Sequence, residues 1–78
     1  MNKSIYNTLN KTLEGQTVTV KKLLNNDSMR RRLQDIGVIE GTKILCLQKS
    51  FSGDPTAYLI RGSVIALRKE DSEKIIVE

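Results

Sequence analysis

The stretch TAYLIRGSVIALR, residues 56–68, decides the fold of this sequence. It contains two runs rich in apolar and β-branched residues, residues 56–61 and 63–68, separated by Gly62. Glycine accepts the positive φ that a tight hairpin turn requires, so the pattern predicts an antiparallel β-hairpin. Because Pro55 cannot donate to a strand ladder, the first strand should begin directly after it, and the turn-rich residues 50–55 form a loop.

Three further strands are expected outside this hairpin. Residues 16–21 alternate, with Val18 and Val20 on one face, as in a half-buried strand. Residues 42–48 are apolar on both faces, so the sequence predicts a strand with both faces covered. Residues 75–77 give a short closing strand, and residues 70–74 before it are expected to form one helical turn.

One short helix is expected between the first two of these strands. It follows the turn signal at Asn25 and Asn26, with Asp27 or Ser28 as its N-cap. Three apolar residues at helical spacing form one stripe along it: Met29, Leu33 and Ile36. Gly37 is placed for a left-handed C-cap, and residues 38–41 read as a turn ending in a second glycine, so the helix has about two turns.

These elements define the expected fold class as mainly β. Five strands and one helix within 78 residues predict a small, SH3-like, partly open five-stranded antiparallel barrel. An open sheet with the helix on one face is the alternative. A chain this short sustains one core, so residues 1–78 are expected to form one domain, with residues 1–8 as a flexible arm. Ile5, Leu9 and Leu13 suit a helical lead-in or an arm packed on the core.

The composition argues against an enzyme and against a cofactor or metal site. The sequence has no histidine and a single cysteine, Cys46, which lies in an apolar strand and reads as a core residue. Glu70, Asp71 and Glu73 form the one acidic cluster, and the dipole of a short helix explains them. There is no phosphate-binding glycine motif. The chain opens without an apolar signal segment, so we expect a cytoplasmic protein whose membrane connections run through a partner.

The charge is basic and unevenly placed. The net charge is +4, and residues 1–39 carry all of the excess. The candidate basic patch is Lys21, Lys22, Arg30, Arg31 and Arg32. It is either a solvated face or the surface of a nucleic-acid or ribosome-associated barrel. Because no aromatic residue interleaves with these cations, stable nucleic-acid binding is not expected. Asp35 is placed to pair with Arg31 or Arg32 along the helix.

Five motifs, in order, carry a resemblance to a known family. They are Leu9-x-x-x-Leu13-x-Gly15, Arg32-Leu33-x-Asp35-Ile36-Gly37-Val38-x-x-Gly41-Thr42, Gly53-Asp54-Pro55, Arg61-Gly62-x-x-Ile65-Ala66-Leu67-Arg68 and Ile75-x-Val77. Over about residues 9–77 the sequence resembles the FeoA family. The resemblance implies a small cytoplasmic SH3-like accessory protein of bacterial ferrous iron uptake. Its implied partner is FeoB, a large membrane transporter with a cytosolic GTP-binding domain.

The resemblance also singles out four residues as contacts to a partner: Arg32, Asp35, Asp54 and Arg68. Whether such a protein promotes GTP hydrolysis, holds domains together or acts as a scaffold stays open. The family term for transition-metal binding is at odds with the composition, and no tight Fe²⁺ site is expected. Where the family often has proline, this sequence has Glu14 and Glu40; replacing either by proline should stabilise the protein by about 0.4–1 kcal/mol.

Overall fold

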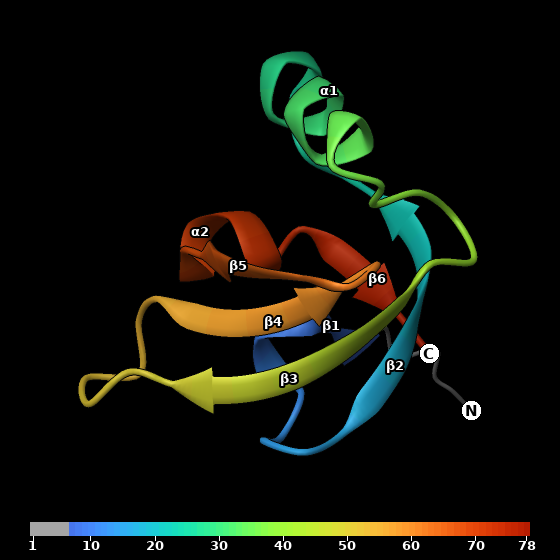
Figure 1. Ribbon diagram of the computed structural model, residues 1–78. Coiled ribbons are helices and arrows are strands. Elements are labelled where there is room, and N and C mark those ends of the chain that lie inside the picture. The colour runs from blue at the N-terminus through green and yellow to red at the C-terminus, as the bar shows by residue number, and fades with distance from the viewer. Residues whose placement is uncertain (1–6) are drawn as a thin grey trace, which may run out of the picture.

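The computed structural model describes residues 7–78, which form six short strands, two α-helices and one 3₁₀ helix (Figure 1). In chain order these are β1 (Asn7–Thr8), η1 (Leu9–Lys11, the 3₁₀ helix), β2 (Thr17–Leu23), α1 (Asp27–Asp35), β3 (Lys43–Lys49), β4 (Thr56–Ile60), β5 (Ser63–Leu67), α2 (Lys69–Ser72) and β6 (Ile75–Val77). No helix within residues 7–78 is long and apolar enough to cross a membrane.

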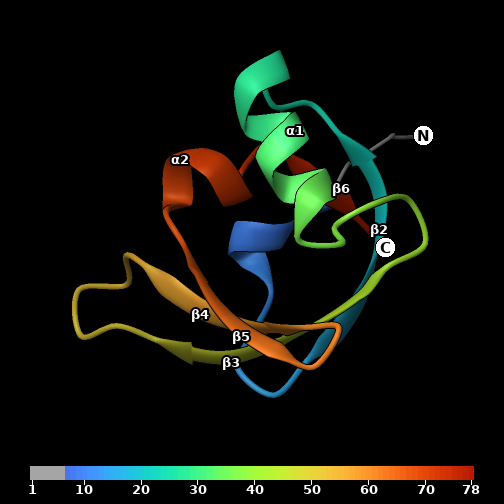
Figure 2. The same cartoon turned by 45° about the horizontal axis from the view of Figure 1, so that its top comes forward.

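The strands form one antiparallel sheet in the order β1-β6-β2-β3-β4-β5, which curls into a partly open barrel (Figures 1 and 2). The mainly β prediction is confirmed, with one additional strand. β1 is only two residues long, Asn7 and Thr8, and pairs with β6, so no alternating pattern could announce it. These two residues belong to the segment expected as a flexible arm; the rest of that arm, including Ile5, lies outside the described residues.

The predicted hairpin of residues 56–68 is confirmed as β4 and β5. Its turn consists of Arg61 and Gly62, with φ of 50° and 84°, and its flanking residues Ile60 and Ser63 pair. Positive φ at both central residues defines the turn type whose twist matches that of the strands. The loop at residues 50–55 projects beyond the strand ends in Figure 1, and β4 starts directly after Pro55, as expected.

The core fills the inside of the barrel. Its buried members are Leu9, Val18, Val20, Leu33, Val38, Ile44, Cys46, Tyr58, Ile60, Leu67, Ile75 and Val77. The expectation that both faces of β3 are covered is wrong, because Ile44 and Cys46 are buried whereas Leu47 on the other face is 37% exposed. A barrel of one layer has only one dry face.

The helical segments differ in detail from those expected. The N-cap of α1 is Asn26, whose side-chain Oδ1 accepts a hydrogen bond from the Met29 N–H at 2.9 Å, and not Asp27 or Ser28. Of the apolar stripe only Leu33 is fully buried, while Ile36 is 41% exposed. Near the start of the described chain Leu9 is buried in the single 3₁₀ turn η1, so the expected short helical lead-in packed on the core is confirmed at Leu9, whereas Leu13 is exposed.

Two turns of one kind carry the glutamates that stand in place of proline. Residues 13–16 and 39–42 each close with a main-chain hydrogen bond from the fourth residue to the first, at 3.0 Å, and Gly15 and Gly41 have φ of 86° and 93°. Positive φ at the third position is the mark of a type II turn, which favours proline at the second. Glu14 has an additional role, since its Oε2 accepts a hydrogen bond from the Lys49 N–H at 2.7 Å.

Candidate partner-binding groove between α1 and β5

A groove of about 340 Å³ separates α1 from the C-terminal half of β5. α1 stands at one end of the barrel, and Figure 2 shows it between α2 and β2. The apolar lining of the groove consists of Met29, Leu33, Ile36, Ile65, Ala66 and Leu67. Leu33 and Leu67 are buried and anchor the two walls in the core, whereas Met29, Ile36 and Ile65 remain partly exposed. The groove therefore offers an apolar floor that solvent reaches.

A close contact at the end of α1 sets the position of this helix relative to the β4–β5 hairpin. Gly37 follows α1 with φ of 100°, and a Cβ added there would lie 2.2 Å from Cδ of Arg61 in the hairpin turn. Only glycine accepts both this φ and this approach. The Thr42 hydroxyl holds the same segment, because it donates to the Gly37 carbonyl oxygen at 2.9 Å and accepts from the Ile39 N–H at 3.1 Å.

Two of the four predicted contact residues meet in the groove. Arg32 reaches it from α1 and Arg68 from the junction of β5 and α2; both are exposed. Asp71 is the one carboxylate in the lining. Within residues 7–78 the only ion pair joins Arg30 to Asp27 at 2.5 Å, so neither groove arginine is neutralised there. The predicted pairing of Asp35 with Arg31 or Arg32 is therefore wrong for the described residues, in which the ion pair of α1 joins Arg30 to Asp27 at the opposite end of the helix.

The other two predicted contact residues lie outside the groove. Asp35 is exposed at the C-terminal end of α1. Asp54 lies in the loop before β4, and its Oδ1 accepts a hydrogen bond from the Lys69 N–H at 2.9 Å. The N-cap residue of α2 is Arg68, whose side chain makes no capping hydrogen bond. The Asp54 carboxylate therefore supplies the acceptor for a main-chain N–H in the first turn of α2. Asp54 therefore has a structural role in positioning α2.

The candidate basic patch is divided between two elements. Lys21 and Lys22 lie on β2 and border a hollow that also contains Glu40 and Leu24. Arg30 and Arg31 lie on α1, where Arg30 is engaged with Asp27 and Arg31 is exposed. Carboxylates thus lie close to part of the predicted patch: Glu40 borders the same hollow as Lys21 and Lys22, and Asp27 pairs with Arg30. The fifth patch residue, Arg32, lines the groove.

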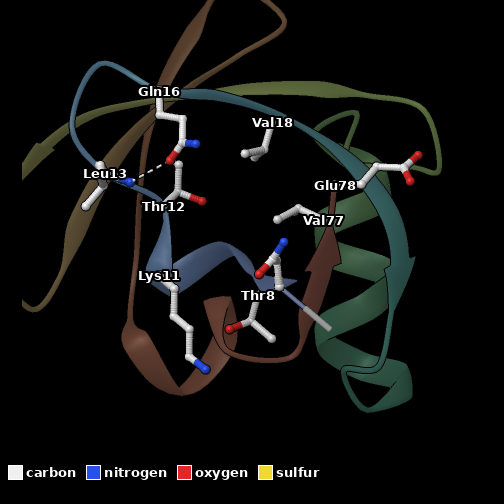
Figure 3. A pocket seen from close by; sticks show the side chains of 9 residues that line it. Thr8, Lys11, Thr12, Leu13, Gln16, Val18, Val77 and Glu78 are labelled. Atoms are coloured by element: carbon white, nitrogen blue, oxygen red, sulfur yellow. Dashed lines mark hydrogen bonds between the residues drawn. The ribbon is translucent and has the colours of Figure 1, made fainter. Parts of the chain in front are cut away.

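A separate hollow of about 360 Å³ lies between η1, β2 and the C-terminal end of the chain (Figure 3). Its lining includes Thr12, Gln16, Val77 and Glu78, and Gln16 Oε1 accepts from the Leu13 N–H at 3.0 Å. The buried Thr12 hydroxyl has no hydrogen-bond partner among the residues the structure describes. None of the predicted contact residues or basic-patch residues lines this hollow, so we take the groove as the candidate functional site.

The ionisable core residues are held in their neutral forms. Burial raises the pKa of the Cys46 thiol above its ordinary value of 9.0, against a smaller opposing effect of Lys49. Burial likewise raises the pKa of Tyr58, which lies in the core with a hydroxyl 3.5 Å from the Leu9 carbonyl oxygen. Because the thiolate is the reactive form of cysteine, Cys46 has the chemistry of a core residue at neutral pH.

The acidic residues of the described chain do not converge. Among residues 7–78, no three histidine, cysteine, aspartate or glutamate side chains are grouped as metal ligands would be. Glu70 and Asp71 occupy the first turn of α2, the position that the helix dipole favours for acids. Glu73 is the C-cap residue of α2, where the helix dipole does not favour an acid, so the expectation that the dipole explains all three acids is correct for Glu70 and Asp71 and wrong for Glu73.

Sequence reasoning missed the apolar part of the site. The sequence placed Met29 and Ile36 on one helical stripe with Leu33, and Ile65 in a strand of the hairpin, without assigning any of the three to a surface site. The separation of α1 from β5 leaves them partly exposed instead. One signal was present: the helical stripe contains only three apolar residues, too few to cover both the core and a neighbouring strand.

Fold and groove together define a small, mainly β, SH3-like protein. The sequence matches the family described as "FeoA domain" over residues 7–78. The chain belongs to the FeoA family, as the motif resemblance implied. No curated protein sequence matches this chain.

Solved structures of FeoA proteins have the same fold. The FeoA-like protein of Clostridium acetobutylicum is 32% identical, with a TM-score of 0.85 over 97% of this chain and 88% of that one. The FeoA protein of Chlorobium tepidum is 28% identical, with a TM-score of 0.87 over 91% of this chain and 68% of that one. A zinc complex of Stenotrophomonas maltophilia FeoA, described as an SH3 domain protein, is 23% identical and has a TM-score of 0.82 over 91% and 88% of the two chains.

Proposed function

We propose that this chain is a single-domain, non-enzymatic, cytoplasmic accessory protein of ferrous iron uptake. It acts by binding the cytosolic part of a FeoB-type membrane transporter, the protein that carries the GTP-binding domain. The family match over residues 7–78 carries the proposal. It is supported by the description of the Stenotrophomonas relative as a possible activating factor of bacterial ferrous iron transport.

The chemistry of the chain supports a binding role over a catalytic one. The sequence has no histidine, and its one cysteine is buried with a raised pKa. The chain therefore lacks the usual arrangement of a nucleophilic side chain beside a histidine that acts as general base. What the structure does present is an open groove with an apolar floor and two cations, Arg32 and Arg68, that form no ion pair within residues 7–78. Apolar area flanked by unsatisfied charge is the composition of a protein-binding surface.

The test uses the purified partner. The full-length FeoB-type transporter encoded in the same genome is reconstituted in lipid nanodiscs, and binding of the purified chain is measured by biolayer interferometry at about physiological ionic strength. We expect binding that Arg32→Glu and Arg68→Glu each weaken by about tenfold, because a reversed charge at a complementary contact costs of the order of 1.4 kcal/mol.

Matched controls separate the groove from overall charge. Arg31→Glu on the exposed side of α1 and Lys69→Glu next to Arg68 make the same charge changes outside the groove lining. Both should bind like the unmodified protein. No binding to the nanodiscs would overturn the proposal, and equal weakening by all four variants would show that net charge, and not the groove, carries the interaction.

A further inference from the structure

β5 is an edge strand with a free row of main-chain groups. In the strand order it is last, and within residues 7–78 it pairs with β4 alone. Ile60 and Ser63 flank a two-residue turn and so form a hydrogen-bonded pair, and the pairs alternate along an antiparallel ladder. Val64 and Ala66 are therefore the residues whose N–H and C=O groups point to the open edge. Val64 is 67% exposed, so solvent reaches this edge.

This edge lacks the features that normally prevent strand pairing. The sequence of β5, Ser-Val-Ile-Ala-Leu, contains no charged residue and no proline. Natural proteins usually protect exposed edges with lysine, proline, bulges or a covering segment, because an unprotected edge is a template for another chain. The β5 edge is therefore suited to binding an additional strand.

The free edge of β5 lies beside the α1–β5 groove, so one ligand could contact both features. Ala66 belongs both to the free edge and to the groove lining. The groove has an apolar floor and two cations, Arg32 and Arg68, without an ion pair in the described part of the chain. We propose that an extended segment of the partner adds to β5 as a seventh strand, placing alternate apolar side chains in the groove and carboxylates against the two arginines. This inference rests on the proposed function, whose partner it describes chemically as an acidic and apolar β-strand.

A second copy of this chain fits the edge less well. If two β5 strands paired antiparallel about Ile65, residue 68 of one copy would face residue 62 of the other. Arg68 would then lie beside the Arg61–Gly62 turn of the second copy, next to a like charge. Arg61 is one residue from the position opposite Arg68, and like charges this close across a strand pair repel each other. Charge complementarity thus favours an acidic segment from a different protein.

The test selects peptides without assuming the partner. Random linear peptides displayed on phage are selected on the full chain, synthesised, and titrated against ¹⁵N-labelled protein by NMR. We expect the selected sequences to alternate apolar and other residues, with Asp or Glu near the ends. Their binding should protect the Val64 and Ala66 amides from solvent exchange. Selection of no peptide, or of peptides that leave both amides unprotected, would overturn the proposal.

Two sets of variants make the outcome specific. Ala66→Pro removes the outward N–H while leaving the hydrogen bonds to β4 in place, as edge strands tolerate, and should weaken peptide binding by about tenfold or more. If this variant does not fold, the charge reversals Arg32→Glu and Arg68→Glu replace it, with Arg31→Glu and Lys69→Glu as controls. Arg32→Glu and Arg68→Glu should weaken the binding of acidic peptides. The same two variants should strengthen the binding of peptides in which lysine replaces the acids. Binding indifferent to the groove reversals would refute the proposed strand.

Comparison with the nanodisc experiment keeps the two proposals apart. Transporter binding that Ala66→Pro leaves unchanged refutes strand addition and leaves the partnership intact. Peptide binding at β5 without any transporter binding refutes the partnership and leaves strand addition intact.

Discussion

Replacing Gly37 by alanine tests how α1 is held against the β4–β5 hairpin. Two costs are expected at this residue. Its φ of 100° is one that residues with a Cβ rarely adopt, and the new methyl would lie 2.2 Å from Arg61 Cδ. The backbone strain is about 1–2 kcal/mol, and moving the arginine side chain from its rotamer adds about 0.5–1.5 kcal/mol. The sum, about 1.5–3.5 kcal/mol, is a large part of the stability of a small domain.

Gly41→Ala provides the matched control. Gly41 has a similar φ of 93°, but no atom lies within 4 Å of the position its Cβ would take. This variant should therefore show the backbone cost alone. Urea unfolding followed by circular dichroism gives both free energies, and each kcal/mol lost should lower Tm by about 4–8 °C in a domain of this size.

Removing the Arg61 side chain then separates the two costs. In the Arg61→Ala background, Gly37→Ala should cost no more than Gly41→Ala, because no side chain remains for the methyl to displace. The reasoning is refuted if the two glycine substitutions cost the same in the unmodified protein. It is also refuted if Gly37→Ala keeps its full excess cost without the arginine.

Four further predictions concern other parts of the chain. Glu40→Pro should stabilise the protein by about 0.4–1 kcal/mol in urea unfolding. Glu14→Pro should gain less stability, because it loses the hydrogen bond that Glu14 accepts from the main chain of β3. Equal gains from the two variants would contradict this contact. Asp54→Ala should destabilise by about 1 kcal/mol and Asp54→Asn by less, since the amide oxygen can still accept from α2; thermal melts distinguish the two. Burial raises the folded-state pKa of Cys46 above 9.0, so above about pH 9 the unfolded chain loses this proton first and stability should fall with rising pH, a component that Cys46→Ala removes. Anaerobic calorimetry with Fe²⁺ should show no site of micromolar affinity or better, in line with the absence of histidine from the sequence.

Local patterns were sufficient for most of the fold. The hairpin of β4 and β5 and the start of β4 after Pro55 were predicted, and the turn with positive φ at Gly41 was predicted one residue early, at residues 38–41 in place of 39–42. Each depends on backbone conformations that particular residues permit or forbid. The strand β1 and the N-cap Asn26 were not. β1 is too short to carry a pattern, and Asn26 competes with two neighbouring residues that are equally good caps by composition.

The site was predicted only in part. The motif resemblance singled out Arg32 and Arg68, and the fold brings them into one groove although they are far apart in the sequence. It also singled out Asp54, which the structure shows accepting a hydrogen bond at the start of α2. A sequence motif marks a residue type without saying whether its side chain faces a partner or the protein's own main chain.

The sequence by itself determined the class of fold, the family and the absence of histidine chemistry, because alternation, turn residues and composition act locally or add along the chain. The tertiary structure alone decided that α1 stands away from β5, that Met29, Ile36 and Ile65 remain partly exposed, and that β5 is left as a free edge. These features depend on how the sheet curls and where it stays open. That is a balance of packing among residues distant in sequence, which no local pattern records.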